Sequence, residues 1–266
     1  MQDHGQESFL RRIRSALKRP SLQPAPGVTL ALSRQAVDIE QLLATVRGRS
    51  RHDRLHLLDQ LMAAGQSINL NVVALSDAAA TAKAIVELVD RKTPEWGTGK
   101  RVAAWRHPLI DALDLPRLLS AAGVPVIVAE PEKPPVGAHP PAVPFHERVA
   151  RAFIGVTAAD FCVAQTGTLV LKTRPGQDRS VSLLPPIHVA VITLDQVLAS
   201  FTELYTCLSH DPVHQVEGIT GCMTFISGPS KTADIEAVMV HGAHGPKEVW
   251  LYVITGPGGR PSQPGP

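Results

Sequence analysis

The spacing of apolar residues changes near residue 69, and this change divides the chain into two differently patterned parts. Before it, Glu7–Lys18, Asp38–Val46 and Asp53–Ala64 carry apolar residues at the three- and four-residue spacing of an amphipathic helix. A stretch that contains several prolines and a glycine separates the first of these segments from the second. We therefore expect residues 1–66 to form a helical N-terminal arm that packs on a domain or on a partner.

Beyond residue 69, short apolar runs alternate with helical patterns, and Ser76 or Asp77 can cap the first helix. Strands separated by helices of this length favour parallel pairing through right-handed crossovers. We therefore expect an α/β domain over residues 67–256, built as a three-layer α/β/α sandwich with a mostly parallel sheet. The expected strands are Asn71–Leu75, Arg101–Trp105 and Val124–Ala129, and the expected helices are Ala78–Asp90 and Asp111–Ala121.

Two stretches rich in proline interrupt this alternation. Pro131–Pro144 predicts a stiff, extended loop, because each proline fixes its own backbone and removes a hydrogen-bond donor. We interpret it as a surface excursion within one domain, and the alternative is a linker between two domains. Residues 257–266 are rich in glycine and proline, which predicts a disordered tail.

Composition narrows the classes of partner. The chain of 266 residues has a formal net charge of +2 and only 4% aromatic residues. These values do not favour a nucleic-acid partner or an anionic membrane surface. No apolar run approaches the ~20 residues that span a bilayer, and the first residues lack the apolar core of a signal peptide. We therefore expect a cytoplasmic protein without a membrane span.

The three cysteines, Cys162, Cys207 and Cys222, lie far apart in the sequence. Structural zinc and iron–sulfur sites usually take ligands from closely spaced pairs, because one turn presents two ligands to one ion. His241 and His244 are closely spaced, but no convincing cluster of carboxylates accompanies them. We therefore predict no metal site, and no cofactor bound by this chain alone.

Two apolar strands flank a polar turn at Gln165, Thr166, Gly167 and Thr168. The glycine allows close approach of the backbone, and the threonine hydroxyls can contact an anion or a carbonyl. The plainer alternative is a tight hairpin whose threonines satisfy backbone groups.

A second polar position follows two prolines, where His188 begins an apolar run that is typical of a buried strand. Its imidazole could exchange a proton near neutral pH, or it could simply pack and hydrogen-bond locally. The segment after this run, Asp195–Leu208, has the pattern of a helix.

The third segment, Phe225–Glu236, predicts a strand, a turn at Gly228 and then a helix capped by Ser230 or Thr232. A helix amino terminus presents free amides to a carboxylate or phosphate, whereas Asp234 would favour the helix start. The spacing does not match a phosphate-binding P-loop, because serine precedes Lys231. His244 follows in a glycine-rich turn and could meet a ligand at the sheet edge.

The order AQTGTLVL, SLLPPIHVAVI, ISGPSKTADIE and HGAHGPKEVWLYVI resembles the lactate-utilisation protein C family, which carries the LUD domain. The resemblance is close over residues 158–254 and looser from Asn69. It implies a fold related to the sugar-phosphate isomerase and coenzyme A transferase superfamily. It also implies a role in oxidising L-lactate to pyruvate, with iron–sulfur clusters in two partner proteins.

This sequence departs from the family at Gln165, where the resemblance leads us to expect glutamate. A neutral amide cannot serve as nucleophile or base in the way that a carboxylate can. It still donates and accepts hydrogen bonds, so binding of a small anion would survive the change. We therefore assign no catalytic residue.

Two hypotheses follow. In the first, the chain is a subunit or accessory protein of the lactate-oxidising system, with a pocket for a small carboxylate or phosphate at the strand ends. In the second, it is a stand-alone binding or transferase-like protein for a phosphorylated or acyl ligand. A structural adaptor with an empty pocket is a third alternative. The expected ligand-binding residues are Gln165, Thr166, Gly167, Thr168, His188, Gly228, Ser230, Thr232, Asp234 and His244.

Overall fold

The computed structural model of the protein describes most of the chain from residue 38 to residue 256. The Pro-rich loop at residues 130–142 and the tail at 257–266 lie outside the described residues, as does most of the predicted arm before residue 38. The described residues are 38–95, 97, 99–129, 143–215, 222–233, 239–242 and 244–256, with Phe9, Arg12, Ile13, Ser15 and Ala16 in a helical conformation.

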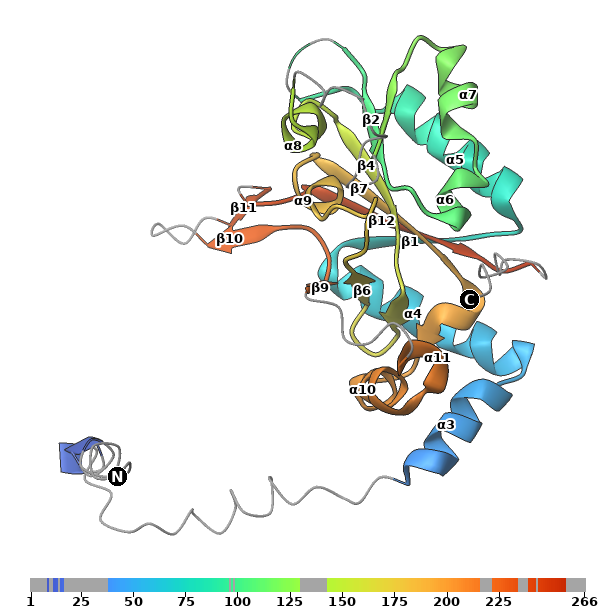
Figure 1. Cartoon of the computed structure of the whole chain (residues 1–266), viewed down its shortest axis with the longest axis vertical. Helices are drawn as coiled ribbons and strands as arrows, with labels where there is room; N and C mark the ends of the chain where they lie inside the picture. The colour runs from blue at the N-terminus through green and yellow to red at the C-terminus, as the bar shows by residue number, and fades with distance from the viewer. Residues whose placement is uncertain are drawn as a thin grey trace, which may run out of the picture. The chain divides into compact units, whose positions relative to one another are not determined.

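A six-stranded parallel sheet forms the centre of the α/β unit, in the order β1-β12-β7-β4-β2-β3 (Figure 1). Its strands are rich in valine, isoleucine and alanine, as expected of parallel strands that are buried on both faces. The predicted α/β fold with a mostly parallel sheet is confirmed. The strands are β1 (Leu70–Leu75), β2 (Val102–Ala104), β3 (Val126–Val128), β4 (Ile154–Ala158), β7 (Ile187–Thr193) and β12 (Glu248–Ile254).

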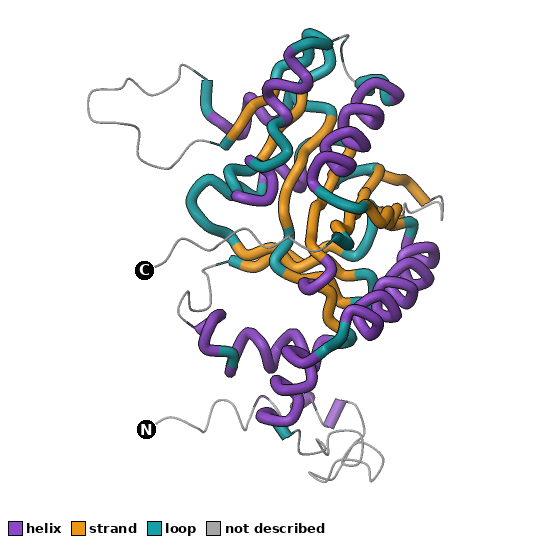
Figure 2. Tube along the Cα trace, turned by 90° about the vertical axis from the view of Figure 1, so that its right-hand side faces the viewer, coloured by secondary structure: helices purple, strands orange, loops and turns teal. Residues whose placement is uncertain are grey.

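Helices cover both faces of this sheet, as the orange strands between purple helices in Figure 2 show. One face packs against α5, α6 and α7 through the core cluster of Ile85, Leu119 and Val189. The other face packs against α4, whose Leu58 and Leu61 join a second core cluster. The described helices are α3 (Ile39–Gly48), α4 (Arg51–Ile68), α5 (Ala78–Arg91), α6 (Pro108–Asp111), α7 (Leu115–Ser120), α8 (Phe145–Val149), α9 (Ser180–Leu183), α10 (Phe201–His210) and α11 (Pro212–Gln215).

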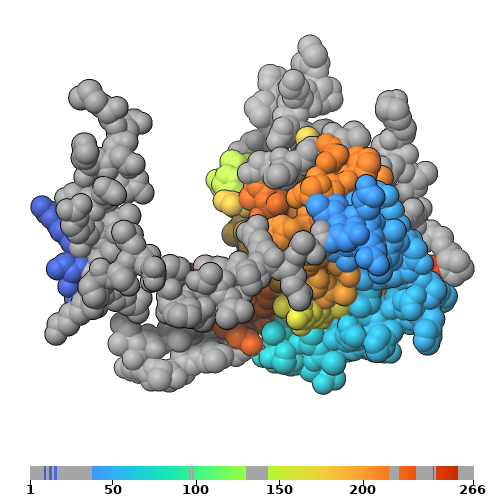
Figure 3. Space-filling model, turned by 90° about the horizontal axis from the view of Figure 1, so that it is seen from below, coloured from blue at the N-terminus to red at the C-terminus, as the bar shows by residue number. Residues whose placement is uncertain are grey.

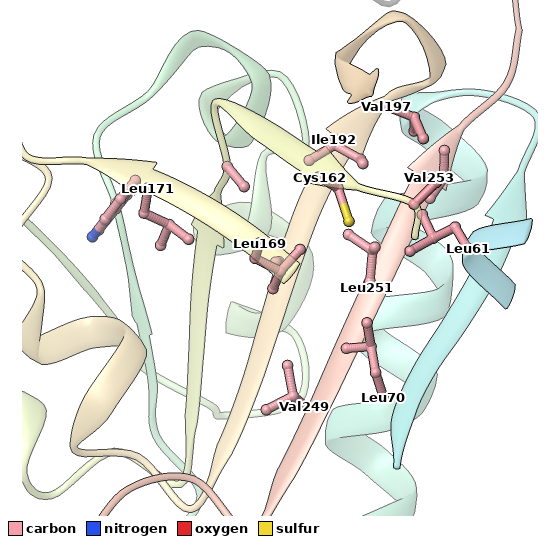
Figure 4. Close-up of a cluster of buried hydrophobic side chains, with 14 of the residues drawn as sticks. Leu61, Leu70, Cys162, Leu169, Leu171, Ile192, Val197, Val249, Leu251 and Val253 are labelled. Carbon is pink, nitrogen blue, oxygen red and sulfur yellow. The ribbon is translucent and has the colours of Figure 1, made fainter. Parts of the chain in front are cut away.

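A smaller four-stranded sheet lies on the α4 side, and the sequence did not predict it as a separate layer. Its inner residues Cys162, Leu169 and Leu171 belong to the same core cluster as Val249 and Leu251 of the large sheet (Figure 4). Two more strands form a separate hairpin. The small sheet contains β5 (Phe161–Val163), β6 (Thr168–Lys172), β8 (Val197–Leu198) and β9 (Met223–Ile226), and the hairpin contains β10 (Lys231–Ala233) and β11 (Met239–His241).

The helical segments expected near residues 38–46 and 53–64 are present as α3 and α4. Ser50 caps α4, because its hydroxyl accepts a hydrogen bond from the Asp53 amide while the Asp53 carboxylate accepts one from the Ser50 amide. Arg49 pairs with Glu203 of α10, which joins this corner to the small sheet, and Figure 3 shows α3 and α4 in blue beside α10 in orange. The division of the chain near residue 66 stays a prediction.

The structure corrects two predicted helices. The helix expected over 111–121 is two short helices, because Asp114 adopts a left-handed conformation with φ of 48° between them. The helix expected over Asp195–Leu208 begins late. Leu194–Gln196 makes one 3₁₀ turn and Val197–Leu198 pairs with β5, so the helix begins only at Phe201, after the cap Ser200.

A third predicted helix, after the Gly228 turn, is wrong. Lys231–Ala233 is instead a strand, paired antiparallel with Met239–His241. The pairing partner lies six residues beyond this strand, so the local cap-like sequence could not reveal it. Ser230 and Thr232 are therefore not helix caps, and Asp234 lies outside the described residues.

Candidate functional site

Two of the predicted polar positions meet a serine in one row of hydroxyl groups. The Oγ1 atoms of Thr166 and Thr168 lie 2.7 Å apart, and the Thr168 Oγ1 lies 2.8 Å from the Oγ of Ser227. The antiparallel pairing of β6 with β9 brings Ser227 beside Thr168, although 59 residues separate them. We call Thr166, Thr168 and Ser227 the hydroxyl row. The sequence singled out the two threonines but missed Ser227, which only this long-range pairing reveals.

The hydroxyl row has one proton to spare. Its three hydroxyls share two hydrogen bonds, which use two of the three O–H groups. Among the described residues the third O–H has no acceptor, so it can donate to a ligand. The neighbouring Gln165 has an exposed side chain, and its backbone amide donates to the carbonyl of Ala199. A surface with a spare hydroxyl donor and an exposed amide can hydrogen-bond a small anion.

Two glycines set the position of the row. Gly167 and Gly228 both have positive φ, of 63° and 78°, which favours glycine. An added Cβ at Gly228 would lie 2.3 Å from the carbonyl oxygen of Ile68, and one at Gly167 would lie 2.8 Å from the Ile68 side chain. Both turns therefore press against the end of α4, just before β1. This places the row at the amino end of β1, whereas ligands of open α/β sheets usually sit at the carboxyl ends.

A cleft of about 710 Å³ opens next to the Gly228 turn. Pro229 forms part of its wall, beside the amino end of β1. Two ion pairs cross its rim: Lys92 with Glu248 at 2.5 Å, and Lys247 with Glu95. The cleft is lined by Met62, Gln66, Asn69, Leu70, Asn71, Val72, Val73, Lys92, Pro229, Lys247, Glu248 and Trp250.

Ser230 lies against the loop that carries His244. The Ser230 amide donates to the Pro246 carbonyl, and the Ser230 carbonyl accepts from the Gly242 amide. An added Cβ on Gly245 would lie 3.3 Å from the Ser230 side chain, so the two loops are in close contact. His244 is exposed and does not line the cleft. Thr232 lies in β10, and its side chain is outside the described part.

His188 is separated from these groups by its burial. It begins β7, as predicted, but its side chain has no exposed surface, and its Nε2 lies 2.9 Å from the hydroxyl of Thr157. Its Nδ1 has no hydrogen-bond partner among the described residues. Burial lowers the pKa of His188 to about 3, so the ring is neutral at physiological pH. A neutral ring in the sheet interior supports the packing alternative over proton exchange with a surface ligand.

The carboxyl ends of β2 and β4 carry a different polar group, which the sequence analysis did not single out. The Asp160 carboxylate accepts hydrogen bonds from the Lys172 amide at 2.7 Å and from Arg174 at 2.6 Å. Burial lowers the pKa of His107 nearby, and its Nδ1 accepts from the Leu109 amide. Because Arg174 is paired with Asp160 and Lys172 is buried, these two cations hold their own chain in place.

The described residues contain no group of three or more His, Cys, Asp or Glu side chains that could hold a metal ion. Burial raises the pKa of Cys162, which keeps that thiol protonated, and burial raises the pKa of Cys207 to about 11. Among the described helices, none is both long enough and apolar enough to cross a membrane.

Comparison with known proteins gives one family. The family model described as LUD domain matches residues 58–254. The chain is similar to the lactate utilization protein C of Halalkalibacterium halodurans, with 32% identity over 168 residues that cover 63% of this chain and 68% of that protein. It is 39% identical over 111 residues to the protein of the same name from Exiguobacterium, covering 41% of this chain and 46% of that protein.

The matched region is less than half the length of several other relatives with this name, such as the 43% matched in the protein from Geobacillus sp. strain WCH70. A crystal structure of a DUF162 family protein from Deinococcus radiodurans is similar over 77% of this chain and 99% of that chain, with 21% identity and a TM-score of 0.47. Because the LUD model matches well over half of its residues, the chain belongs to the LUD-domain family of lactate utilization protein C.

Proposed function

We propose that this chain takes part in lactate utilisation as a subunit or accessory protein without its own cluster. In this proposal it acts with iron–sulfur partner proteins that oxidise L-lactate to pyruvate. Its membership of the LUD-domain family, whose similar proteins are named for lactate utilization, is the observation that carries the proposal. The wide spacing of Cys162, Cys207 and Cys222 fits a division of labour in which the partners hold the clusters.

The ligand proposed for this chain is a small carboxylate, bound at the hydroxyl row. The spare hydroxyl proton and the exposed side-chain amide of Gln165 can donate hydrogen bonds to carboxylate oxygens. Neither group needs to change its charge to do so. Glycine at positions 167 and 228 supports this site, because both turns must approach the end of α4 closely. The neutral Gln165 fits a binding role better than acid–base chemistry.

The first experiment tests the subunit role. The tagged chain is purified from its native cells, and the eluate is assayed for iron and for lactate-dependent dye reduction. Iron–sulfur partners together with activity support the proposal. An iron-free, inactive protein contradicts it and favours a stand-alone binding protein for a phosphorylated or acyl ligand.

The second experiment tests the ligand site by calorimetric titration with L-lactate, pyruvate and inorganic phosphate. Thr166→Val removes one end of the hydroxyl row, and binding should weaken about tenfold because a donor or acceptor is lost. Thr45→Val is the matched control, since Thr45 is an exposed α3 threonine that bonds only to its own helix backbone. Equal affinities of the two variants for the ligand would show that the hydroxyl row does not bind it.

A further inference from the structure

The free edge of β1 is the feature that carries a further inference, which does not depend on the proposed function. β1 lies at the border of the six-stranded sheet and pairs with β12 on one side (Figure 1). Its six residues, LNVVAL, include no charge and no proline. Natural proteins usually protect an edge strand with a charged residue, a proline or a bulge, because its unpaired backbone groups attract other strands. An edge without these devices is typical of a strand that accepts a partner.

The direction of the backbone groups follows from one hydrogen bond. The Leu75 carbonyl accepts from the Thr255 amide at 2.8 Å, so Leu75 points its backbone toward β12. Because backbone groups alternate along a strand, Asn71 points the same way, while Val72 and Ala74 point toward the free edge. Among the described residues, the backbone amides and carbonyls of Val72 and Ala74 have no hydrogen-bond partner at the free edge.

The 710 Å³ cleft runs along this edge. Asn69, which ends α4, and the four strand residues Leu70–Val73 line it, and at 3.3 Å per residue the strand part corresponds to about 13 Å. Met62 of α4 stands on one side, and Lys92, at the end of α5, stands on the other. The edge therefore lies in a groove with walls. In a second copy of this chain, the residues that flank β1 would collide with the same residues of the first copy. A single extended segment has no such flanking residues and can enter the groove.

We propose that this groove binds an extended, uncharged segment of a partner protein, which adds a strand to the edge of β1. The backbone of the segment pairs with Val72, and its side chains alternate between the two walls. One row of side chains meets Met62, which is 37% exposed, and Val72, so apolar residues fit there. The other row meets Trp250 and the Lys92–Glu248 ion pair, where polar, uncharged residues fit.

The probe for the first test is a labelled hexapeptide of alternating valine and threonine, measured by fluorescence polarisation on the full chain. The matched probes carry N-methyl groups on alternate residues, in each of the two registers. One methylated register should bind about tenfold more weakly, because it lacks the donors that face β1, and the other should bind normally. Equal binding of all three peptides, or of none, would overturn the proposal.

Two variants locate the binding edge. Val72→Pro removes the outward-facing amide without removing a bond to β12, and proline is tolerated on edge strands. Val72→Thr keeps the amide and nearly the same shape. The proline variant should lose about tenfold in affinity and the threonine variant should retain binding, with melting temperature as the check on folding. Equal affinity of the two folded variants would contradict pairing at Val72.

Amide hydrogen exchange keeps the proposal testable if the proline variant fails to fold. In the free protein the amides of Val72 and Ala74 should exchange fast, while those of Asn71 and Val73 are protected by β12. The peptide should then protect Val72. Protection of Val72 and Ala74 that rises with protein concentration, together with a dimer mass, would instead assign the edge to a second copy and overturn the proposal.

Discussion

Replacing His188 with glutamine should change how stability depends on pH. Burial lowers the pKa of His188 to about 3, compared with about 6.5 in an unfolded chain. Between these values the unfolded chain binds a proton at this residue and the folded chain does not. The free energy of unfolding therefore falls as the pH falls from about 6.5 toward 3. Above about 6.5 the ring is neutral in both states, and the contribution disappears.

The size of the effect follows from the same two values. At pH 5.0 the unfolded chain gains about 2 kcal/mol from protonating His188, and at pH 7.5 it gains almost nothing. The side chain has no exposed surface, so solvent does not weaken this estimate. With a urea m-value of about 2 kcal/mol per M, the midpoint should fall by about 1 M for this reason alone.

The assay is urea unfolding of the wild-type chain and of His188→Gln at pH 7.5 and pH 5.0. Glutamine can keep the hydrogen bond to Thr157 but does not titrate, and all other titrating groups are common to both proteins. The wild-type chain should lose about 2 kcal/mol more than the variant on acidification. Equal losses would show that His188 is accessible to protons in the folded chain, and the account of its burial would be wrong.

Two further substitutions test the packing. An added Cβ at Gly155 would lie 1.9 Å from the Val181 carbonyl oxygen, so Gly155→Ala should lower the melting temperature by about 10 °C, whereas Gly99→Ala, with open space around it, should change it little. Glu203→Gln should cost about 3 kcal/mol in urea unfolding, because Arg49 loses the charge that balances it inside the protein. Equal effects of the two glycine changes, or a Glu203→Gln cost below about 0.5 kcal/mol as for exposed pairs, would contradict this reasoning.

Local signals in the sequence were sufficient for most of the large sheet. Asp77 precedes an amphipathic run and caps α5, since its carboxylate accepts from the Ala80 amide at 2.8 Å. The strand expected over Asn71–Leu75 is β1, almost to the residue. These elements were predictable because the cap and the apolar spacing lie within a few residues of each other, and the buried sheet then reinforces both.

Pairing between distant segments was not predictable in the same way. Ser230 and Thr232 look like helix caps, yet Lys231–Ala233 is a strand because Met239–His241 pairs with it. The hydroxyl row has the same origin, since Ser227 reaches Thr168 only through the pairing of β6 with β9. His188 was expected at the start of a strand and is there, but the layers that bury it come from other parts of the chain.

The hydroxyl row and the cleft along β1 meet at one turn, but different residues form them. The two proposals can therefore be tested separately. Gly228 presses on the Ile68 carbonyl from the side of the row, and its neighbour Pro229 lines the groove. Thr166→Val alters the row without touching the groove, whereas Val72→Pro alters the free edge without touching the row. If each variant affects only its own ligand, the turn is rigid. If each variant affects both ligands, the two sites are coupled across their shared boundary, which the Gly228 turn forms together with Leu70, a residue that lines the cleft and lies beside Gly167.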